Sequence, residues 1–413
     1  MVGTRKRIAR RTFLAAAGAG AVGLVGARFA VPRLLAARPI RPLSKGARRV
    51  GDEALEGLDL ERVWDGHVHL VGTGAGDTGC WVNPRVRSPW HPIERLRYDI
   101  YLAASGVEDQ ADADREYLER LLGLQRDANP RGAFVALAFD LRVREDGTED
   151  RERSAFYTPN EYVLAVAREH PEVIPCASIH PYRADAEERL RAAVEAGARG
   201  VKWVPNSMRI DLLSPRCDLF YRALAETGLP LVTHVGREQA VPGAEQEWGN
   251  PLRLRRPLEA GVRVVAAHAA SLGDDLDLDA PEKTREEVPA FDLLIRLFEE
   301  PRWVGLLFAD ISALTLAFRS GRPLRELLRR EDLHPRLLYG SDYPLPAIRW
   351  MTNLSSLVRS GVLDASDADP LDEMRSSNPL LFDLVLKRRL RLLEKGRAYR
   401  FPSSVFETAP FFS

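Results

Sequence analysis

Two histidines separated by one residue, His67 and His69, end an apolar stretch of the chain. Side chains of a β-strand alternate between its two faces, so these two imidazoles are expected to point to the same side. A pair of neutral imidazoles at a strand end can hold one divalent metal ion. A His-x-His pair also occurs in proteins without metal, with one ring in the core and the other in solvent. The remaining residues of the chain must therefore decide between the two interpretations.

Further histidines follow apolar runs later in the chain. His180, His234 and His268 each stand at the end of a predicted strand. In a barrel of parallel strands, the carboxyl ends of all strands meet at one mouth, where active sites are built. Five of the chain's eight histidines are expected at that mouth. Chance placement is a poor explanation for this distribution.

Lys202 and Asp342 are the charged residues expected at the same mouth. Lys202 lies inside the apolar string Gly-Val-Lys-Trp-Val, and an unpaired buried ammonium group is costly. Its side chain could reach solvent or a salt bridge, contact a substrate, or become carbamylated and bridge two metal ions. Asp342 follows the last predicted strand and precedes Leu345. It could cap a helix N-terminus or bind a metal.

A pattern of short apolar strand, loop and amphipathic helix is repeated from residue 60 onward. The expected strands are 61–67, 134–139, 173–179, 200–204, 231–235, 262–268, 304–310 and 336–342. The expected helices are 92–105, 109–127, 159–169, 184–196, 216–227, 250–260, 290–299 and 322–331. Strands that alternate with helices indicate a parallel sheet, and eight such units are the number that a (β/α)8 barrel needs. The predicted fold class is α/β, a TIM barrel.

The predicted barrel domain covers residues 59–395. Its last part, 345–395, is expected to add C-terminal helices outside the barrel. Residues 31–58 are predicted to form a linker, and 396–413 an extended C-terminal tail.

The composition excludes several functional classes. Lys+Arg and Asp+Glu both total 59, whereas a nucleic-acid-binding protein should show a basic excess. The three cysteines, Cys80, Cys176 and Cys217, lack C-x-x-C spacing, so neither a zinc knuckle nor a disulfide framework is indicated. The glycine-rich loop 71–91 lacks G-x-G-x-x-G spacing, which argues against a dinucleotide site.

Residues 1–30 are predicted to form an export signal. Arg10-Arg11-Thr12-Phe13-Leu14 resembles the twin-arginine signal, and residues 13–27 carry no charge. The uncharged run is shorter than the roughly 20 apolar residues that a transmembrane helix needs. The expected partner is the twin-arginine export machinery, and the expected location is periplasmic or extracellular. An uncleaved N-terminal anchor is the alternative.

The motifs at the strand ends resemble those of the amidohydrolase superfamily of metal-dependent barrel hydrolases, most of all its amidohydrolase-related branch. The resemblance is carried by Gly200-Val201-Lys202, by residues 229–234 and by residues 339–344. In that family His-x-His follows strand one, a lysine sometimes follows strand four, histidines follow strands five and six, and an aspartate follows strand eight. The matching residues here are His67, His69, Lys202, His234, His268 and Asp342.

The resemblance implies one or two divalent metal ions held by His67, His69, Lys202, His234 and Asp342. Zinc is expected first, with manganese or iron as alternatives, and one essential metal is favoured. A metal of this kind lowers the pKa of bound water to about 7. Asp342 would then accept the proton and pass it to the leaving group, and His268 would polarise the substrate carbonyl.

The implied activity is hydrolysis of an amide, ester or lactone C–N or C–O bond in a small molecule. The alternative is a metal-dependent lyase that decarboxylates a small aromatic or unsaturated acid on the same barrel. A barrel that has lost catalysis and only binds a ligand is the third interpretation, against which the intact ligand set argues.

Loops after the strands are expected to contact the substrate. The candidates are His180, Arg183, Trp203 and Arg237, although each could instead form a structural salt bridge or pack in the core. The sequence leaves a homo-oligomer open.

Overall fold

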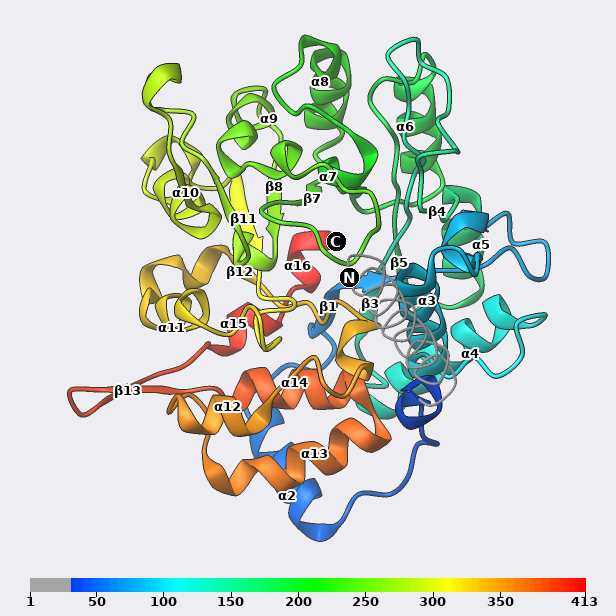
Figure 1. The fold of residues 1–413 in the computed structure, drawn as a ribbon. Coiled ribbons are helices and arrows are strands. Elements are labelled where there is room, and N and C mark those ends of the chain that lie inside the picture. The colour runs from blue at the N-terminus through cyan, green and yellow to red at the C-terminus, as the bar shows by residue number, and fades with distance from the viewer. Residues whose placement is uncertain (1–30) are drawn as a thin grey trace, which may run out of the picture.

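The computed structural model describes residues 31–413, and the predicted signal at 1–30 lies outside the described residues. A ring of short parallel strands is surrounded by helices (Figure 1). The parallel strands are β1 (Trp64–His69), β3 (Ala133–Leu137), β5 (Val173–Cys176), β6 (Val201–Trp203), β7 (Leu231–His234), β8 (Val264–Ala267), β11 (Leu307–Asp310) and β12 (Leu337–Leu338). The predicted α/β barrel class is confirmed.

The strands form a three-stranded sheet of order β1-β3-β5 and a five-stranded sheet of order β12-β11-β8-β7-β6. Isolated parallel bridges join the two sheets at both junctions, Val68 with Tyr343 and Ala177 with Val201. Neighbouring strands in space are thus also neighbours in the chain, and their carboxyl ends lie at one mouth.

Strand side chains alternate between the barrel interior and the surrounding helices. Val135, Val232 and Val265 pack inside the barrel, where they form one apolar cluster with Phe412. Side chains on the opposite face, such as Trp203, join the larger core between strands and helices. This alternation determines which residues near a strand end can reach the mouth.

The barrel helices lie close to their predicted ranges. They are α3 (Pro92–Ala104), α4 (Ala113–Ala128), α5 (Asn160–Glu169), α6 (Ala186–Glu195), α8 (Asp218–Thr227), α9 (Arg255–Glu259), α10 (Ala290–Phe298) and α11 (Arg322–Arg329). The stretch predicted as one helix at 250–260 divides into a 3-10 turn, Pro251–Leu254, and α9. Helix α8 ends at Gly228, whose φ of 70° is the left-handed conformation that favours glycine after a helix.

The loops between the barrel strands and helices contain several short elements. They are β2 (Trp81–Val82), β4 (Phe156–Tyr157), α7 (Pro205–Met208), β9 (Asp274–Leu276) and β10 (Glu287–Pro289). Strands β2 and β4 form one antiparallel pair, and β9 and β10 form another.

The predicted C-terminal helices are α12 (Leu354–Arg359), α13 (Ala368–Ser377) and α14 (Pro379–Arg389). The predicted linker at 31–58 is wrong in part, because helix α2 (Lys45–Leu55) packs against α13 and α14. Its buried residues, Ala47, Val50, Gly51 and Ala54, recur at helical spacing. Three of these four residues are alanine or glycine, so the helix has little apolar surface. Its helical periodicity was therefore hard to recognise in a segment rich in arginine.

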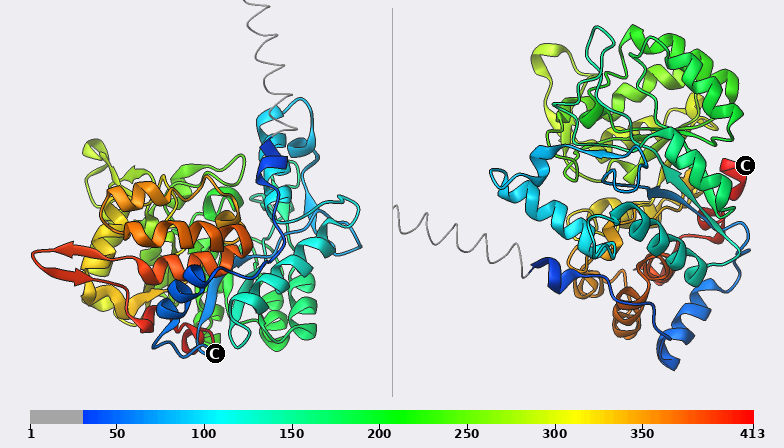
Figure 2. Two further views of the ribbon diagram at one scale, coloured as in Figure 1. Left: turned by 90° about the horizontal axis from the view of Figure 1, so that it is seen from below. Right: turned by 90° about the vertical axis from the view of Figure 1, so that its right-hand side faces the viewer.

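The predicted extended tail at 396–413 is also wrong. After a short hairpin of β13 (Leu392–Glu394) and β14 (Arg397–Tyr399), it forms α15 (Ser403–Phe406) and α16 (Ala409–Phe412). Phe412 enters the apolar barrel interior, and the Thr408 hydroxyl donates to the Trp64 carbonyl at 2.6 Å. Helix α16 lies at the end of the barrel away from α3 (Figure 2). Burial of the tail's aromatic side chains thus folds a segment without clear periodicity.

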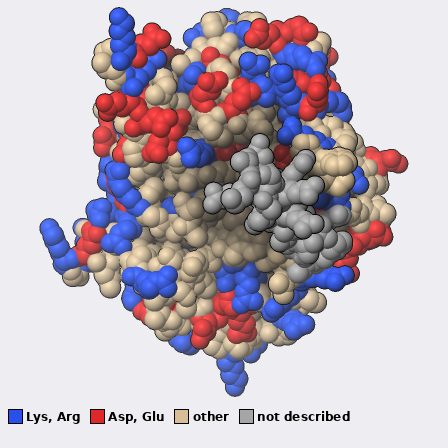
Figure 3. All heavy atoms as spheres, in the orientation of Figure 1, with Lys and Arg blue, Asp and Glu red and all other residues tan. Residues whose placement is uncertain are grey.

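Acidic and basic side chains are interspersed over the face shown in Figure 3, in line with the equal numbers of the two. Within residues 31–413, no helix combines the length and the apolarity needed to cross a membrane.

Candidate metal centre

Three of the predicted ligands converge at the carboxyl ends of β1 and β12. The ligand atoms of His67, His69 and Asp342 all lie within 4.8 Å of one another. Asp342 Oδ1 is 3.3 Å from His69 Nε2 and 3.6 Å from His67 Nε2. Two imidazole nitrogens and a carboxylate oxygen are donors that suit a divalent transition metal. Asp342 does not cap a helix, because the following 3-10 turn, Leu345–Ala347, has Pro344 at its N-cap.

The backbone after β12 is held against β1, and this contact places Asp342. The Asp342 amide donates to the His67 carbonyl at 2.8 Å. A Cβ at Gly340 would lie 2.7 Å from His67 Cβ, so only glycine permits this approach. Asp342 itself has a φ of 64°, in the left-handed region where aspartate and asparagine are tolerated best.

Two buried side chains, Asp65 and Lys387, hold the backbone of the segment 340–341 that precedes Asp342. Asp65 Oδ1 accepts hydrogen bonds from the Ser341 amide at 2.7 Å and the His67 amide at 3.1 Å. Lys387 Nζ donates to the Gly340 carbonyl at 2.7 Å. The contacts of Asp65 with Ser341 and of Lys387 with Gly340 join residues distant in sequence, so the position of Asp342 depends on β1 and α14 together.

Asp310, at the end of β11, is a site residue that the sequence analysis missed. Its Oδ2 is 2.8 Å from His67 Nδ1, and its Oδ1 accepts from the His268 amide at 2.9 Å. Burial opposes ionisation of Asp310, but contact with His67, Ser312 and the His268 amide nevertheless lowers its pKa below the ordinary value. A charged residue ending an apolar strand was the available signal.

The contact with Asp310 assigns the tautomer of His67. A carboxylate accepts hydrogen bonds, so Nδ1 carries the proton and Nε2 presents its lone pair to the centre. Lys202 Nζ lies 3.1 Å from that Nε2. Asp310, His67 and His268 also fall within ligand distance of one another. Because His67 Nδ1 is bonded to Asp310, we assign Asp310 as the residue that orients His67, a common arrangement around metal-binding histidines.

His234, at the end of β7, offers a second free imidazole nitrogen. Its Nδ1 is 3.3 Å from Glu238 Oε2. Its Nε2 is fully buried and has no hydrogen-bond partner within the described part of the chain. Burial lowers the pKa of His234 to about 4, so the ring is neutral at pH 7. A buried lone pair without a partner is unfavourable unless a ligand meets it, and a divalent metal fits this donor.

His268 follows β8 in a tight left-handed turn, with positive φ at His268, Ala269 and Ala270. Its Nδ1 is 2.7 Å from Ser312 Oγ, and the same hydroxyl donates to Asp310. The hydroxyl has one proton, so it accepts from Nδ1, and the neutral ring presents Nε2 as an acceptor. Burial lowers the pKa of His268 well below its ordinary value. The expected polarisation of a carbonyl by His268 therefore requires prior protonation at Nε2.

Lys202 is buried in the barrel interior with 1% of its surface exposed. Burial lowers its pKa, against the opposing charges of Asp310 and Asp342. The neutral amine, which is the form that reacts with carbon dioxide, is thus more accessible than in water. Carbamylation and the number of metal ions stay predictions.

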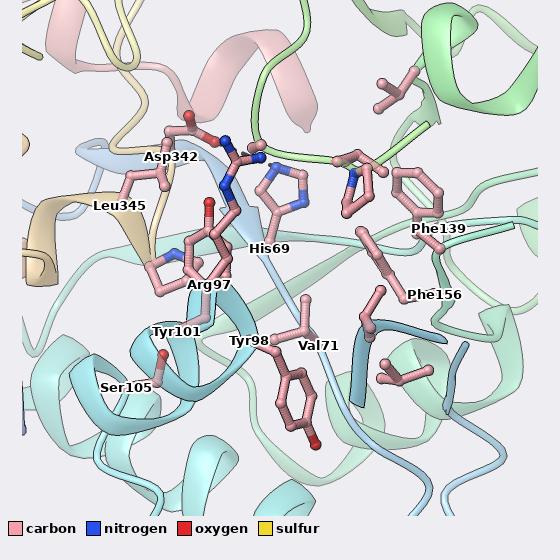
Figure 4. Close-up of a pocket in the computed structure, with 18 of the residues that line it drawn as sticks. His69, Val71, Arg97, Tyr98, Tyr101, Ser105, Phe139, Phe156, Asp342 and Leu345 are labelled. Carbon is pink, nitrogen blue, oxygen red and sulfur yellow. Dashed lines mark ion pairs between the residues drawn. The ribbon is translucent and has the colours of Figure 1, made fainter. Parts of the chain in front are cut away.

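A cavity of about 210 Å³ opens onto this centre. His69, Lys202, His234, His268 and Asp342 form part of its lining. In Figure 4, His69 and Asp342 lie close together, and Arg97 rises from α3 into the same space. Phe139 and Phe156 line a further part of the wall. The ligand set is therefore accessible to a small molecule.

The four predicted substrate contacts lie outside this cavity lining. His180 makes structural bonds through both ring nitrogens, to the Met208 carbonyl and the Tyr182 amide. Arg183 binds Asp140 through two nitrogens, at 2.7 and 2.8 Å.

Trp203 follows Lys202 in β6, so the two side chains point to opposite faces of the strand. Its ring is buried against Phe220 and Tyr221 of α8. Arg237 is exposed and packs beside Gly273. A substrate role for any of these residues gains no support from their positions.

Comparison with solved structures finds distant likenesses. A probable 2-pyrone-4,6-dicarboxylic acid hydrolase from Acinetobacter baumannii has 12% identity and a TM-score of 0.42, over 68% of this chain and 84% of that one. A putative hydrolase of the same name from Pseudomonas putida has 16% identity and a TM-score of 0.42, over 78% and 97%. A 5-carboxyvanillate decarboxylase from Sphingomonas paucimobilis has 11% identity and a TM-score of 0.41, over 77% and 96%.

No curated protein matches the sequence. The family model described as Amidohydrolase (Amidohydro_2) matches residues 64–356, a range that begins with β1 and includes all the residues of the centre. The chain belongs to this amidohydrolase family.

Proposed function

We propose that this protein is a metal-dependent hydrolase that cleaves an amide, ester or lactone bond of a small molecule. The observation that carries the proposal is the Nε2 of His234, which has no hydrogen-bond partner among the described residues and belongs to the same cavity lining as His69 and Asp342. The residues that would hold the metal are His67, His69, His234 and Asp342. Zinc is the first candidate, with manganese or iron as alternatives. When bound, a divalent ion supplies Lewis acidity and lowers the pKa of water to about 7.

Asp342 is the proposed proton acceptor. Burial alone would raise its pKa, but interactions with His69, His67 and Lys202 lower it below its ordinary value. The carboxylate is therefore ionised at neutral pH and can take a proton from the attacking water. It can return this proton to the leaving nitrogen or oxygen as the C–N or C–O bond breaks.

His268 is proposed to assist at the substrate oxygen. The neutral ring presents Nε2 as an acceptor, so His268 would accept a hydrogen bond from the attacking water or from a hydroxyl of the substrate. Asp310 and Ser312 keep the imidazole in this orientation.

The test is a substrate panel with the metal-loaded protein. Lactones, esters and amides should be hydrolysed, chelation should abolish turnover, and added zinc or manganese should restore it. His67→Ala should lose both metal and turnover. Aromatic carboxylic acids are included, with carbon dioxide measured. Carbon dioxide release without hydrolysis of any panel member would overturn the proposal and establish the lyase alternative.

A further inference from the structure

Arg319 is a buried cation without a carboxylate partner, close to the metal centre. Only 6% of its surface is exposed, and no carboxylate of the described residues lies within 4.0 Å of its guanidinium nitrogens. The charges of Glu238, Asp342 and Asp310 act on the guanidinium only from beyond that distance. Among residues 31–413, the Arg319 side chain makes one hydrogen bond, from Nη1 to Ser271 Oγ, at 3.2 Å. The guanidinium therefore retains donors that none of the described residues uses.

Two other buried arginines show that this state is unusual in the chain. Arg142 binds Glu245, and Arg183 binds Asp140 at 2.7 Å. They are buried to a similar degree, with 6% and 8% of the side chain exposed. Burial of a charged group is costly unless an opposite charge pairs with it. Arg142 and Arg183 each have such a partner. No residue of the described range provides one at Arg319, so a bound ligand is the expected partner.

The position of Arg319 points to the substrate as that partner. Arg319 lines the same cavity as His234, His268 and Asp342. Ser271, which holds its guanidinium, is three residues after His268, and the Ser271 amide donates to the His268 carbonyl at 3.0 Å. The cation is thereby fixed relative to the candidate catalytic residues.

The rest of the cavity defines what the anion is attached to. Its walls are largely aromatic and aliphatic, and the aromatic members are Tyr98, Tyr101, Tyr117, Phe139, Phe156 and Phe318. Such walls favour a flat apolar body. The guanidinium fork matches the two oxygens of a carboxylate.

We propose that Arg319 binds a carboxylate of the substrate, so that this protein acts on a small, flat, apolar molecule bearing an acid group. The inference deepens the proposed function and uses it only to call the bound acid a substrate. The group held by Arg319 is distinct from the bond that is cleaved. A second cation, Arg97, also lines the cavity, but it is exposed and donates only weakly, to the Gln239 carbonyl at 3.4 Å.

Benzoate and its neutral analogue benzamide are the probes, and calorimetry on the metal-loaded protein gives both affinities. Arg319→Met should weaken benzoate binding by roughly 10- to 100-fold, the range expected for a charge-assisted hydrogen-bonded pair. Benzamide binding and metal content should stay unchanged. Arg319→Lys, which keeps the charge without the fork, should fall between wild type and Arg319→Met. It also provides the test if the methionine variant does not fold.

Arg97→Met is the matched control and should weaken benzoate binding much less than Arg319→Met. Equal losses in both variants would show a general electrostatic effect and overturn the proposal. It would also be overturned if benzoate affinity survived Arg319→Met but vanished on chelation, because the carboxylate would then sit at the metal. Benzoate binding is measured without turnover. The binding proposal for Arg319 can therefore fail while the hydrolase proposal holds, and the reverse is also true.

Discussion

Replacement of Asp342 by Asn separates metal binding from proton transfer. The residue has a φ of 64°, which asparagine adopts readily, so the backbone against β1 should be preserved. The amide oxygen can remain near His69 Nε2, at the place of the carboxylate oxygen now 3.3 Å away. The amide cannot accept a proton from water at neutral pH, so only the chemical step should suffer.

The expected loss in kcat is at least about 100-fold, the low end of general acid–base contributions. This corresponds to about 2.7 kcal/mol, because each tenfold change is about 1.36 kcal/mol. Metal per chain, measured by elemental analysis in metal-containing buffer, should stay near the wild-type value. His67→Ala should instead lose metal first, because its Nε2 has no substitute.

Glu94→Gln is the matched control, because Glu94 is another cavity-lining carboxylate but pairs with Arg85 at 3.4 Å. It should change neither metal content nor kcat. Near-normal turnover of Asp342→Asn on a substrate that the wild type clearly hydrolyses would refute the role of Asp342. Complete loss of metal in that variant would show that Asp342 acts mainly as a metal ligand. It would refute the claim that this substitution affects proton transfer alone.

Other residues give further predictions. If Lys202 is carbamylated between two metals, Lys202→Ala should lower the metal content from about two per chain, and bicarbonate should aid reconstitution; a wild type with one metal that ignores bicarbonate removes this interpretation. Asp310→Asn should weaken metal affinity by about 10- to 100-fold, as measured by competition with a chelator, because it loosens His67; unchanged affinity would exclude orientation by Asp310. Burial lowers the pKa of His180 to about 4, so its contribution to stability is complete above about pH 6.5 and is lost as pH falls toward 4; His180→Gln should flatten the decrease of Tm over this range, and an unchanged slope would contradict the assignment. If residues 1–30 act as a twin-arginine signal, as predicted, the wild type should be found outside the cytoplasm and the double variant Arg10→Lys/Arg11→Lys inside it, as fractionation would show; equal distribution of the two proteins would contradict the predicted signal.

The barrel and most residues of the candidate metal centre could be predicted because they depend on local periodicity. The period of two places His67 and His69 on one face, and repeated strand–helix units place His234, His268 and Asp342 at one mouth. The alternation of strand side chains would also have excluded Trp203 as a substrate contact. Its neighbour Lys202 faces the barrel interior, so Trp203 must face the surrounding helices. The misassigned segments, α2 and the tail, carry weak periodicity, and their structure depends on packing against α13, α14 and the barrel interior.

The sequence by itself determined the fold class and the chemical identity of the candidate ligands. Only the tertiary structure decided which nitrogen of His67 is free, because Asp310 meets His67 across 243 positions of the chain. It also decided that Arg183 forms an ion pair with a carboxylate and that Arg319 forms none within residues 31–413. Periodicity in sequence reports the face of an element on which a side chain lies. Pairing of charges and hydrogen bonds depends on distances of a few ångströms between distant segments, and these distances exist only once the chain has packed.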